Sequence, residues 1–326
     1  MPNPEKKKFH HYVPQMYLRG FFDPLEEAKK QNVLWLHEVG KRPKRVTIRN
    51  VGGEEDFYAY ENEGTTHTEI EDKLAEIERT VAPTLKKLRS GVIALSAQER
   101  EEFATFVALT LARVRFFSDL TNKFAAETHR QFAGACLKDP KIFEKYFGER
   151  ERSSDERLST TFEEMREFLE KVSSGEIPVE QTSRGWKLKI MMESVLDLSP
   201  LFERMSWGLL QAPHHELFLT SDNPVVLVDP NKSLSKDGGV SYSKAAFFTF
   251  PMSRDYCLQG VKSLARDGTQ LLKPSEVHEI NKTLIAAAYR FVFSPTKEAF
   301  VQEIFEKIHA KRGPLLPNLP QGFLEF

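Results

Sequence analysis

Residues 10–21 read His-His-Tyr-Val-Pro-Gln-Met-Tyr-Leu-Arg-Gly-Phe, and the rest of the chain is best interpreted around this stretch. Proline fixes its own φ and favours extended backbone in the residue before it, so we expect residues 10–13 to be extended. Pro14 then suits the first position of a short helix, and Gly20 suits its end. On that helix Gln15 and Arg19 lie one turn apart on the same face.

The two adjacent histidines of this stretch allow two interpretations. In an extended segment His10 and Tyr12 point to one face, and His11 points to the other. One imidazole could be a general base or a ligand just before the helix N-terminus, where the helix dipole favours the neutral ring. Alternatively, both rings hydrogen-bond to the backbone, and the N-terminal segment packs against the rest of the domain in a purely structural role.

The composition bounds the class of protein. The 326 residues suffice for one large domain or two lobes. Lys and Arg number 46 against 47 Asp and Glu, so no overall field attracts nucleic acid or a membrane, although a local basic groove is compatible with these totals. Two distant cysteines, no signal-peptide pattern and no long apolar run predict a soluble, cytoplasmic protein.

Hydrophobic periodicity predicts the secondary structure. Alternation predicts a strand pair at 33–39 and 45–51, and a period of three to four residues predicts a helix from Thr66. The capping-box sequence at 96–99 begins a second helix that stays apolar through Phe124. Further strands and helices are predicted at 207–211, 216–220, 225–228, 246–251, 256–258, 275–288 (a helix capped by Ser275), 289–293 and 297–310 (a helix).

These elements predict an α+β fold with an N-terminal β-hairpin, a large helical middle and a C-terminal antiparallel sheet with flanking helices. We expect a single domain over residues 1–312. Its helical lobe covers about 65–205, and its β-rich lobe covers about 10–60 plus 206–295. Residues 313–326 form a proline-rich tail.

Arg113 lies within the apolar series of the second helix. A buried guanidinium is costly unless a carboxylate pairs with it, so we expect Glu55, Glu71 or Asp222 to be its partner. The arginine then either holds core elements together through a structural ion pair or binds an anion. Glu55 and Glu71 could also hold a divalent metal, Mg²⁺ or Mn²⁺, although such acids commonly form a solvated face.

Residues 220–224, Thr-Ser-Asp-Asn-Pro, separate two apolar runs. Asp and Asn close Asx-turns, so one interpretation is a turn between core strands. The other places Ser221, Asp222 and Asn223 at a strand end that faces a pocket. A serine without a glycine elbow is weak evidence for a hydrolase.

The motifs at 10–21 and 220–225 resemble those of a bacterial family, the domain of unknown function 4238. Glu55-Asp56-Phe57-Tyr58, the helix that carries Glu71 and Glu78, Arg113, Trp207, residues 250–253 and Asn281 are similar to its other blocks. Met16 departs from the usual phenylalanine and concerns packing only. The resemblance implies membership and carries no particular reaction.

Two kinds of function follow from these residues. The first is an enzyme, a nuclease or nucleotide hydrolase acting on a phosphate-bearing substrate. The segment His-His-x-x-Pro also resembles the first half of the His-Asn-His endonuclease motif, but the segment after Pro14 is helical and His37 lies on a strand. The second is a binding or sensing protein that uses the same polar groups without turnover, which the absence of a phosphate loop or a catalytic triad favours.

The candidate site is the same for both functions. Its ligand is a small molecule or a nucleic acid, no membrane is involved, and the oligomeric state is undetermined. The candidate catalytic residues are His10, His11, Gln15, Arg19 and Asp222. The candidate substrate-binding residues are Tyr12, Tyr58, Arg113, Ser221 and Asn223, and the candidate metal ligands are Glu55 and Glu71.

Overall fold

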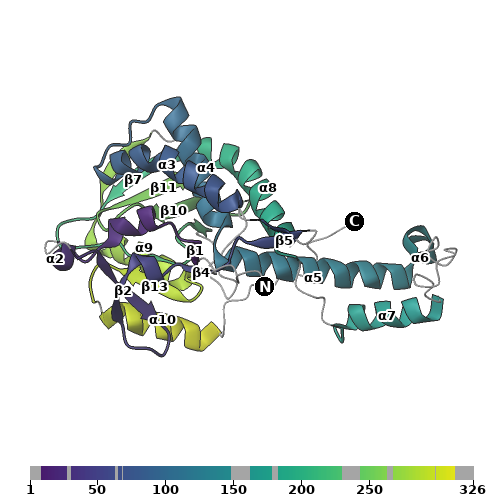
Figure 1. Ribbon diagram of the computed structural model, residues 1–326. Coiled ribbons are helices and arrows are strands. Elements are labelled where there is room, and N and C mark those ends of the chain that lie inside the picture. Colours follow the sequence, from purple (N-terminus) through teal and green to yellow (C-terminus); the bar gives the residue numbers. More distant parts are fainter. Residues whose placement is uncertain are drawn as a thin grey trace, which may run out of the picture. The chain divides into compact units, whose positions relative to one another are not determined.

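The computed structural model describes residues 9–27, 31–62, 65–67, 69–147, 162–177, 183–229, 243–262, 267–297 and 299–312 (Figure 1). The chain divides into two compact units. The first contains residues 1–118 and 184–318, and the second contains residues 119–183 and 319–326. The predicted proline-rich tail lies outside the described residues. The single domain and its lobe limits stay predictions.

The stretch at 10–21 forms an extended segment followed by helical turns, as its proline predicts. Strand β1 (Phe9–His11) pairs antiparallel with β4 (Gly53–Glu55), placing His11 opposite Gly53. Helix α1 (Gln15–Leu18) follows Pro14 and continues as a 3₁₀ turn, η1 (Arg19–Phe21). Gly20 therefore does not end the helical turns. A Cβ at Gly20 would lie 2.7 Å from both Arg89 Nη2 and the Met252 carbonyl oxygen, so glycine permits their close approach.

The N-terminal hairpin belongs to a four-stranded sheet that includes C-terminal strands. Its order is β3 (Lys44–Thr47), β2 (Val33–Glu38), β13 (Phe291–Ser294) and β8 (Thr220–Ser221), and every pair is antiparallel. The predicted strand at 216–220 is thus reduced to two residues, because Asn281 binds the preceding backbone. Its Oδ1 accepts from the Leu219 N–H at 3.1 Å, and its Nδ2 donates to the Leu217 carbonyl at 2.9 Å.

The other C-terminal strands form a separate five-stranded sheet. Its order is β12 (Gly268–Leu271), β7 (Ser206–Gln211), β11 (Tyr256–Val261), β10 (Phe247–Pro251) and β9 (Val226–Val228). All pairs are antiparallel except β12 with β7, which is parallel. Successive side chains reach opposite faces, so Leu209 joins the main core and Leu210 joins a smaller cluster with Val277.

Three long helices pack together over the main core, α3 (Glu69–Arg89), α4 (Ala97–Ala112) and α8 (Arg184–Glu203), and lie side by side in Figure 1. The predicted capping box starts α4: the Ser96 hydroxyl accepts from the Glu99 N–H, and the Glu99 carboxylate accepts from the Ser96 N–H. The helix does not run on to Phe124 as the apolar pattern suggests. It ends at Ala112, and α5 begins at Arg115.

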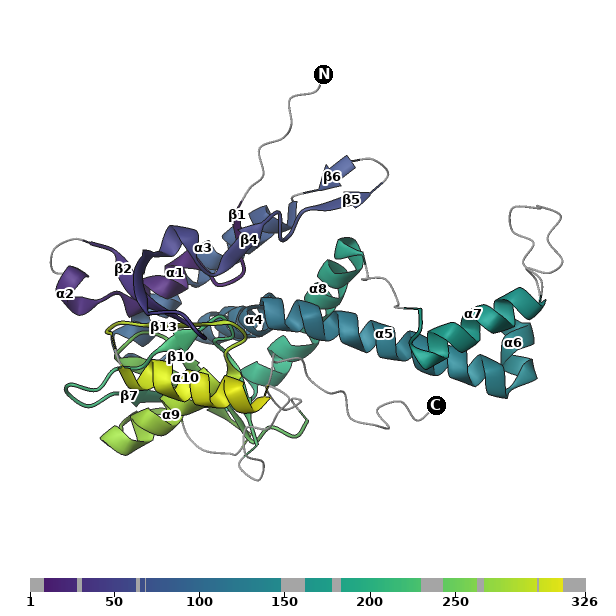
Figure 2. The ribbon, with the colours of Figure 1, turned by 90° about the horizontal axis from the view of Figure 1, so that it is seen from below.

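The remaining helices of the first unit lie around these sheets. Helices α9 (Pro274–Ala287) and α10 (Ala299–Arg312) pack against each other in both ribbon views (Figures 1 and 2). Helix α9 begins at Pro274, so Ser275 is not its cap. Instead the Glu276 carboxylate accepts from the Lys273 N–H at 2.7 Å. The smaller elements are α2 (Pro24–Glu27), η2 (Ile48–Asn50), β5 (Tyr60–Asn62) and β6 (Thr65–His67).

The second unit is helical in its described part. It contains the part of α5 (Arg115–Lys138) after Ser118, with α6 (Pro140–Phe147) and α7 (Phe162–Ser174). Its apolar cluster includes Cys136, Phe143 and Leu169. Among the described residues of both units, no helix combines the length and apolar character needed to cross a membrane. The architecture confirms the predicted α+β class, with two C-terminal sheets in place of one.

Candidate functional site

Several of the predicted residues line one hollow of about 300 Å³. We call it the His11 hollow. It lies where the start of α1 faces α3 and the end of α4. Its predicted lining residues are His11, Gln15, Arg19, Tyr58, Glu71 and Arg113, and Met16, Leu74, Ala75 and Glu78 complete it.

The imidazole of His11 is half-buried and held by a backbone carbonyl. Its Nε2 lies 3.2 Å from the carbonyl oxygen of Ile48, so Nε2 is the donor and Nδ1 of the neutral ring is an acceptor. The amide nitrogen of Gln15 lies 3.4 Å from Nδ1. Burial lowers the pKa of His11 below its usual value, and the nearby charge of Arg113 acts in the same direction. The ring therefore remains a neutral proton acceptor at physiological pH.

The imidazole of His10 has a different environment. It is buried on the other face of β1, where its Nδ1 accepts a hydrogen bond from the Tyr58 backbone N–H at 3.0 Å. Its Nε2 lies 3.3 Å from a Glu71 carboxylate oxygen without hydrogen-bond geometry. The ring stacks on Tyr58 with centroids 5.8 Å apart. His10 therefore fastens β1 to the following segments.

Arg113 is the buried cation at the wall of the hollow, with a side chain only 3% exposed. Its expected partners were Glu55, Glu71 or Asp222, and that expectation is wrong. Nη1 donates to Glu78 at 2.8 Å, Nε donates to the Tyr58 hydroxyl at 3.2 Å, and Nη2 donates to the His11 carbonyl at 2.6 Å. Glu78 lies two turns beyond Glu71 on α3, where it reaches the break between α4 and α5.

Arg19 is the exposed cation of the same hollow. Among the described residues its guanidinium has no hydrogen-bond partner. By contrast, the guanidinium of Arg89 binds the backbone of the same helical turns. Its nitrogens donate to the carbonyls of Met16 at 3.2 Å, Tyr17 at 2.6 Å and Met252 at 2.7 Å. Arg19 is thus exposed to solvent at the edge of the hollow.

The residues at 221–223 form a buried turn and do not line the His11 hollow. The Ser221 hydroxyl bonds to both the N–H and the carbonyl of Asn223, whose amide donates to the Ala287 carbonyl at 3.1 Å. The Asp222 carboxyl accepts backbone N–H bonds from residues 289–291 at 2.7–2.9 Å. Asp222 therefore does not line the hollow that contains His11, and these three side chains connect β8 to the start of β13.

Tyr12 follows His11 in the chain and has another environment. It is buried and packs on Phe57 with ring centroids 5.3 Å apart. Burial raises the pKa of its hydroxyl, and the charges of Asp222 and Glu54 raise it further. Tyr12 is not among the lining residues of the His11 hollow.

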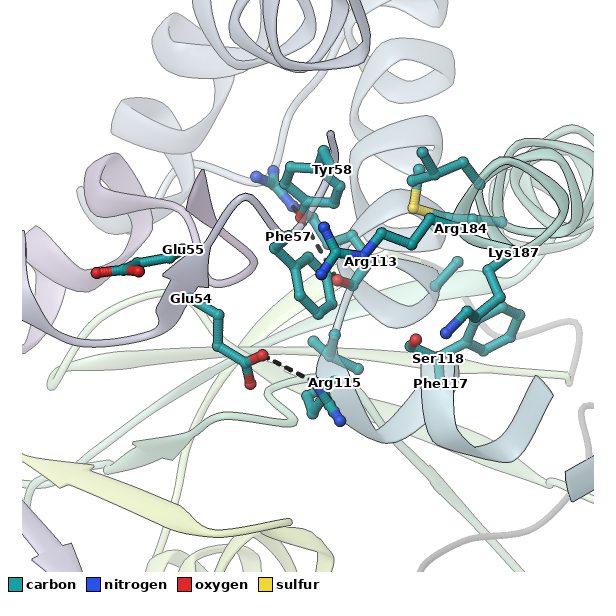
Figure 3. Close-up of a pocket in the computed structure, with 14 residues that line it drawn as sticks. Glu54, Glu55, Phe57, Tyr58, Arg113, Arg115, Phe117, Ser118, Arg184 and Lys187 are labelled. Carbon is teal, nitrogen blue, oxygen red and sulfur yellow. Dashed lines mark hydrogen bonds and ion pairs between the residues drawn. The ribbon is translucent and has the colours of Figure 1, made fainter. Parts of the chain in front are cut away.

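A second, smaller hollow of about 80 Å³ lies across the wall formed by Tyr58 and Arg113 (Figure 3). We call it the basic hollow. Its polar lining includes Glu54, Arg115, Ser118, Arg184 and Lys187. Arg115 pairs with Glu54 at 2.8 Å, whereas Glu55 points away from the other labelled residues. Glu55 and Glu71 therefore line different hollows.

No group of three or more His, Cys, Asp or Glu side chains able to hold a metal ion occurs in the described part of the chain. Of the two predicted metal ligands, Glu71 lies beside His10, and Glu55 is exposed in β4.

Sequence reasoning missed the residues that shape both hollows. The sequence did indicate Glu78, because its spacing from Glu71 places both side chains on the same face of the helix. Arg89 comes directly after the apolar residues of α3, but no neighbouring residue in the sequence indicates that its side chain reaches the carbonyls of α1. Arg184 and Lys187 lie some 70 residues after Arg115, so only the packing of α8 beside the end of α4 brings them together.

The fold and the hollows define an α+β protein with two polar hollows on either side of a buried arginine–tyrosine wall. A family model described as protein of unknown function (DUF4238) matches residues 10–298, so the chain belongs to this family. The membership predicted from the motifs is confirmed. Neither the curated proteins nor the solved structures gave a match to the chain.

Proposed function

We propose that this protein hydrolyses a phosphate ester bound in the His11 hollow. The observation that carries the proposal is the neutral imidazole of His11, whose Nε2–H is held by the Ile48 carbonyl. That contact leaves Nδ1 as a proton acceptor in a hollow that also contains the Arg19 guanidinium. A base and an anion-binding cation that line one hollow suit the attack of water on a phosphate ester.

In this reaction His11 is the general base. A water molecule gives a proton to Nδ1 of His11, while its oxygen forms a new bond to phosphorus. The bond between phosphorus and the leaving oxygen breaks, and the proton held by His11 passes to that oxygen. Arg19 contacts the phosphoryl oxygens, where negative charge is greatest. The Gln15 amide nitrogen, which lies at hydrogen-bond distance from Nδ1 at 3.4 Å, must give up that contact to the attacking water.

Arg113 has a positioning role in this proposal. Three of its nitrogens already donate to Glu78, Tyr58 and the His11 carbonyl, so its contribution is to hold the backbone of His11. Glu71 and Glu78 are the carboxylates of the hollow, and Glu71 is 40% exposed. If a divalent cation assists the reaction, the Glu71 oxygens are available to it.

A second candidate function is ligand binding without turnover. The observation in its favour is that His10, Ser221, Asp222 and Asn223 all hold neighbouring backbone or side chains. Their polarity is then explained by structure alone. The His11 hollow would recognise a phosphate-bearing ligand through Arg19 and Gln15 and release it unchanged.

The two functions are separated by assaying purified protein on DNA, RNA and nucleotides with Mg²⁺ or Mn²⁺. We expect cleavage by the wild type and loss of cleavage in His11→Ala without a change in melting temperature. His214→Ala is the matched control, because His214 is an exposed turn histidine outside both hollows. Absence of turnover in the wild type on every substrate contradicts hydrolysis and favours binding. A large melting loss in His11→Ala together with an inactive wild type shows that the ring is structural.

A further inference from the structure

The turn and second strand of the β2–β3 hairpin begin a run of basic residues that contains no acid. Between Val39 and Gly53 the sequence has five lysines and arginines and no aspartate or glutamate. Strand β3 is the edge strand of the four-stranded sheet, so no other described strand pairs with its outer side. Positive charge therefore follows an open sheet edge, although the chain as a whole is close to neutral.

Two of the five cations are neutralised by acids of neighbouring elements. Lys41 pairs with Glu38 at a nitrogen–oxygen distance of 2.9 Å, and Arg45 pairs with Glu26 at 2.8 Å. Glu38 also pairs with Arg290 at 2.9 Å. These two acids therefore already have cationic partners and leave the rest of the run without a counter-ion.

The other three cations have no acidic partner. We call them the basic strip: Arg42 in the turn, Lys44 at the start of β3 and Arg49 in η2. All three are exposed, and within the described part of the chain none of their side chains forms an ion pair or a hydrogen bond. Extended backbone rises about 3.3 Å per residue, so β3 spreads these charges along a line. A linear array of exposed cations attracts a chain of anions.

The basic strip leads to the His11 hollow. Helical turn η2 follows β3 directly, and in it the Ile48 carbonyl, one residue before Arg49, holds the His11 ring at 3.2 Å. Helix α1 packs against η2, and Arg19 at its end is the exposed cation of the hollow. Positive charge therefore continues from the sheet edge to the candidate base.

An exposed aromatic ring lies next to the same imidazole. Phe9 is 40% exposed, and its ring centroid lies 5.0 Å from that of His11. A Cβ at Gly53 would lie 2.6 Å from a ring atom of Phe9, so the ring rests against the β4 backbone on one side. Proteins that bind single-stranded nucleic acids combine cations that follow the phosphates with aromatic rings on which bases stack. The basic strip and Phe9 supply both.

We propose that the basic strip, Arg19 and Phe9 bind a single-stranded nucleic acid. Its phosphates contact the cations, and one of its bases stacks on Phe9. In a duplex the faces of the bases are covered by their neighbours, so a surface ring cannot reach them. A nucleic acid strand is then the substrate class of the His11 hollow, an assignment that rests on the hydrolysis proposed above. Binding of the strand does not itself require turnover.

The test is fluorescence anisotropy with a labelled single strand of about 12 nucleotides and with the matching duplex. EDTA is present, so that metal-assisted cleavage does not interfere with binding. The wild type is compared with Phe9→Leu and with two triple variants. The strip variant is Arg42→Gln, Lys44→Gln and Arg49→Gln, and the control variant is Lys189→Gln, Lys282→Gln and Lys307→Gln.

The control lysines match the strip in charge but not in position. They are 70%, 50% and 69% exposed and lie on α8, α9 and α10. Each triple variant loses three positive charges, so a difference between the two reports position and not net charge. Every substituted side chain is exposed, so we expect all variants to fold.

We expect the wild type to bind the single strand at low salt and the strip variant to bind it at least about tenfold more weakly. The slope of log affinity against log salt should become shallower by about 2 in the strip variant, because each lost phosphate contact on a single strand removes about 0.7. The control variant should stay within about twofold of the wild type. Phe9→Leu should weaken single-strand binding about tenfold and leave duplex binding unchanged.

Absence of strand binding by the wild type overturns the proposal, as does equal weakening in the strip and control variants. Equal affinity of Phe9→Leu and the wild type for the single strand overturns the stacking of a base on Phe9. Binding to phosphatidylserine vesicles without binding to the strand assigns the strip to an anionic membrane and also overturns the proposal. A wild type that binds the strand but cleaves no substrate with Mg²⁺ or Mn²⁺ contradicts only the proposed hydrolysis.

Discussion

The guanidinium of Arg113 and the carboxylate of Glu78 form an ion pair with a nitrogen–oxygen distance of 2.8 Å at the wall between the two hollows. The Arg113 side chain is 3% exposed and that of Glu78 is 23% exposed. The same guanidinium donates to the His11 carbonyl at 2.6 Å, so the pair connects α3 to the segment that carries the candidate base.

Removing Glu78 should destabilise the protein more than removing Arg113. Glu78→Leu leaves a guanidinium buried without its counter-ion, which costs about 3 to 5 kcal/mol. Arg113→Met removes the charge and leaves a carboxylate that is partly solvated, together with the unpaired His11 carbonyl. Urea denaturation of the two single variants and the double variant measures the difference. A smaller loss in Glu78→Leu than in Arg113→Met would contradict the buried-pair account.

Gly53 should not tolerate a side chain. It lies opposite His11 in the β1–β4 pair, and a Cβ at this position would be 2.4 Å from the His10 carbonyl oxygen. Gly53→Ala must therefore displace β1, and we expect a stability loss of about 1 to 3 kcal/mol. Gly268→Ala is the control, because no atom of the described residues lies within 4 Å of a Cβ there and the residue is in the exposed edge strand β12. Similar melting temperatures for the two variants would show that β1 adjusts freely.

The His11 ring should titrate below its usual pKa of 6.5 because burial disfavours the charged imidazole. The unfolded chain then takes up a proton at higher pH than the folded chain, so this group reduces stability as pH falls below 6.5. Nitrogen-detected NMR of the ring should show a midpoint below 6.5 and a proton on Nε2 in the neutral form. A midpoint above 6.5, or a proton on Nδ1, would remove the general-base role proposed for this ring.

Asp222 should make stability fall as pH rises. Burial raises the pKa of its carboxyl from 3.8 to about 7, and four backbone hydrogen bonds oppose the shift without cancelling it. Between pH about 4 and 7 the unfolded carboxyl is ionised while the folded one retains its proton. The free energy of unfolding therefore declines across this window, by at most about 4 kcal/mol, and this group has no further effect above pH 7.

The check on Asp222 is urea denaturation of the wild type and Asp222→Asn at several pH values across that window. The asparagine does not titrate, so the stability difference between the two proteins isolates this carboxyl. We expect the advantage of the wild type to shrink as pH rises. An advantage that grows with pH would mean that the folded carboxylate is ionised and stabilised by its backbone donors.

Features that depend on neighbours in sequence were predicted well. The capping box at Ser96, the strand pair around Gly40 and the extended segment before Pro14 all form as expected. Each depends on backbone preferences or hydrogen bonds that span a few residues, so the local sequence suffices. The α+β class follows from the same local patterns, because the change from helical to alternating periodicity after Met205 is visible in the residues themselves.

Features that depend on long-range partners required the tertiary structure. Two examples are the ion pair of Arg113 with Glu78 and the hydrogen bonds of Asn281 to residues 217–219, each of which joins segments distant in sequence. A buried charge indicates that some acid must be near, but several acids meet that condition equally well. The sequence by itself thus determined the fold class, most of the elements and which polar groups require partners. Only the folded chain decided which partners they have, because packing of α3, α4 and α8 selects one acid among those that the charge balance allows.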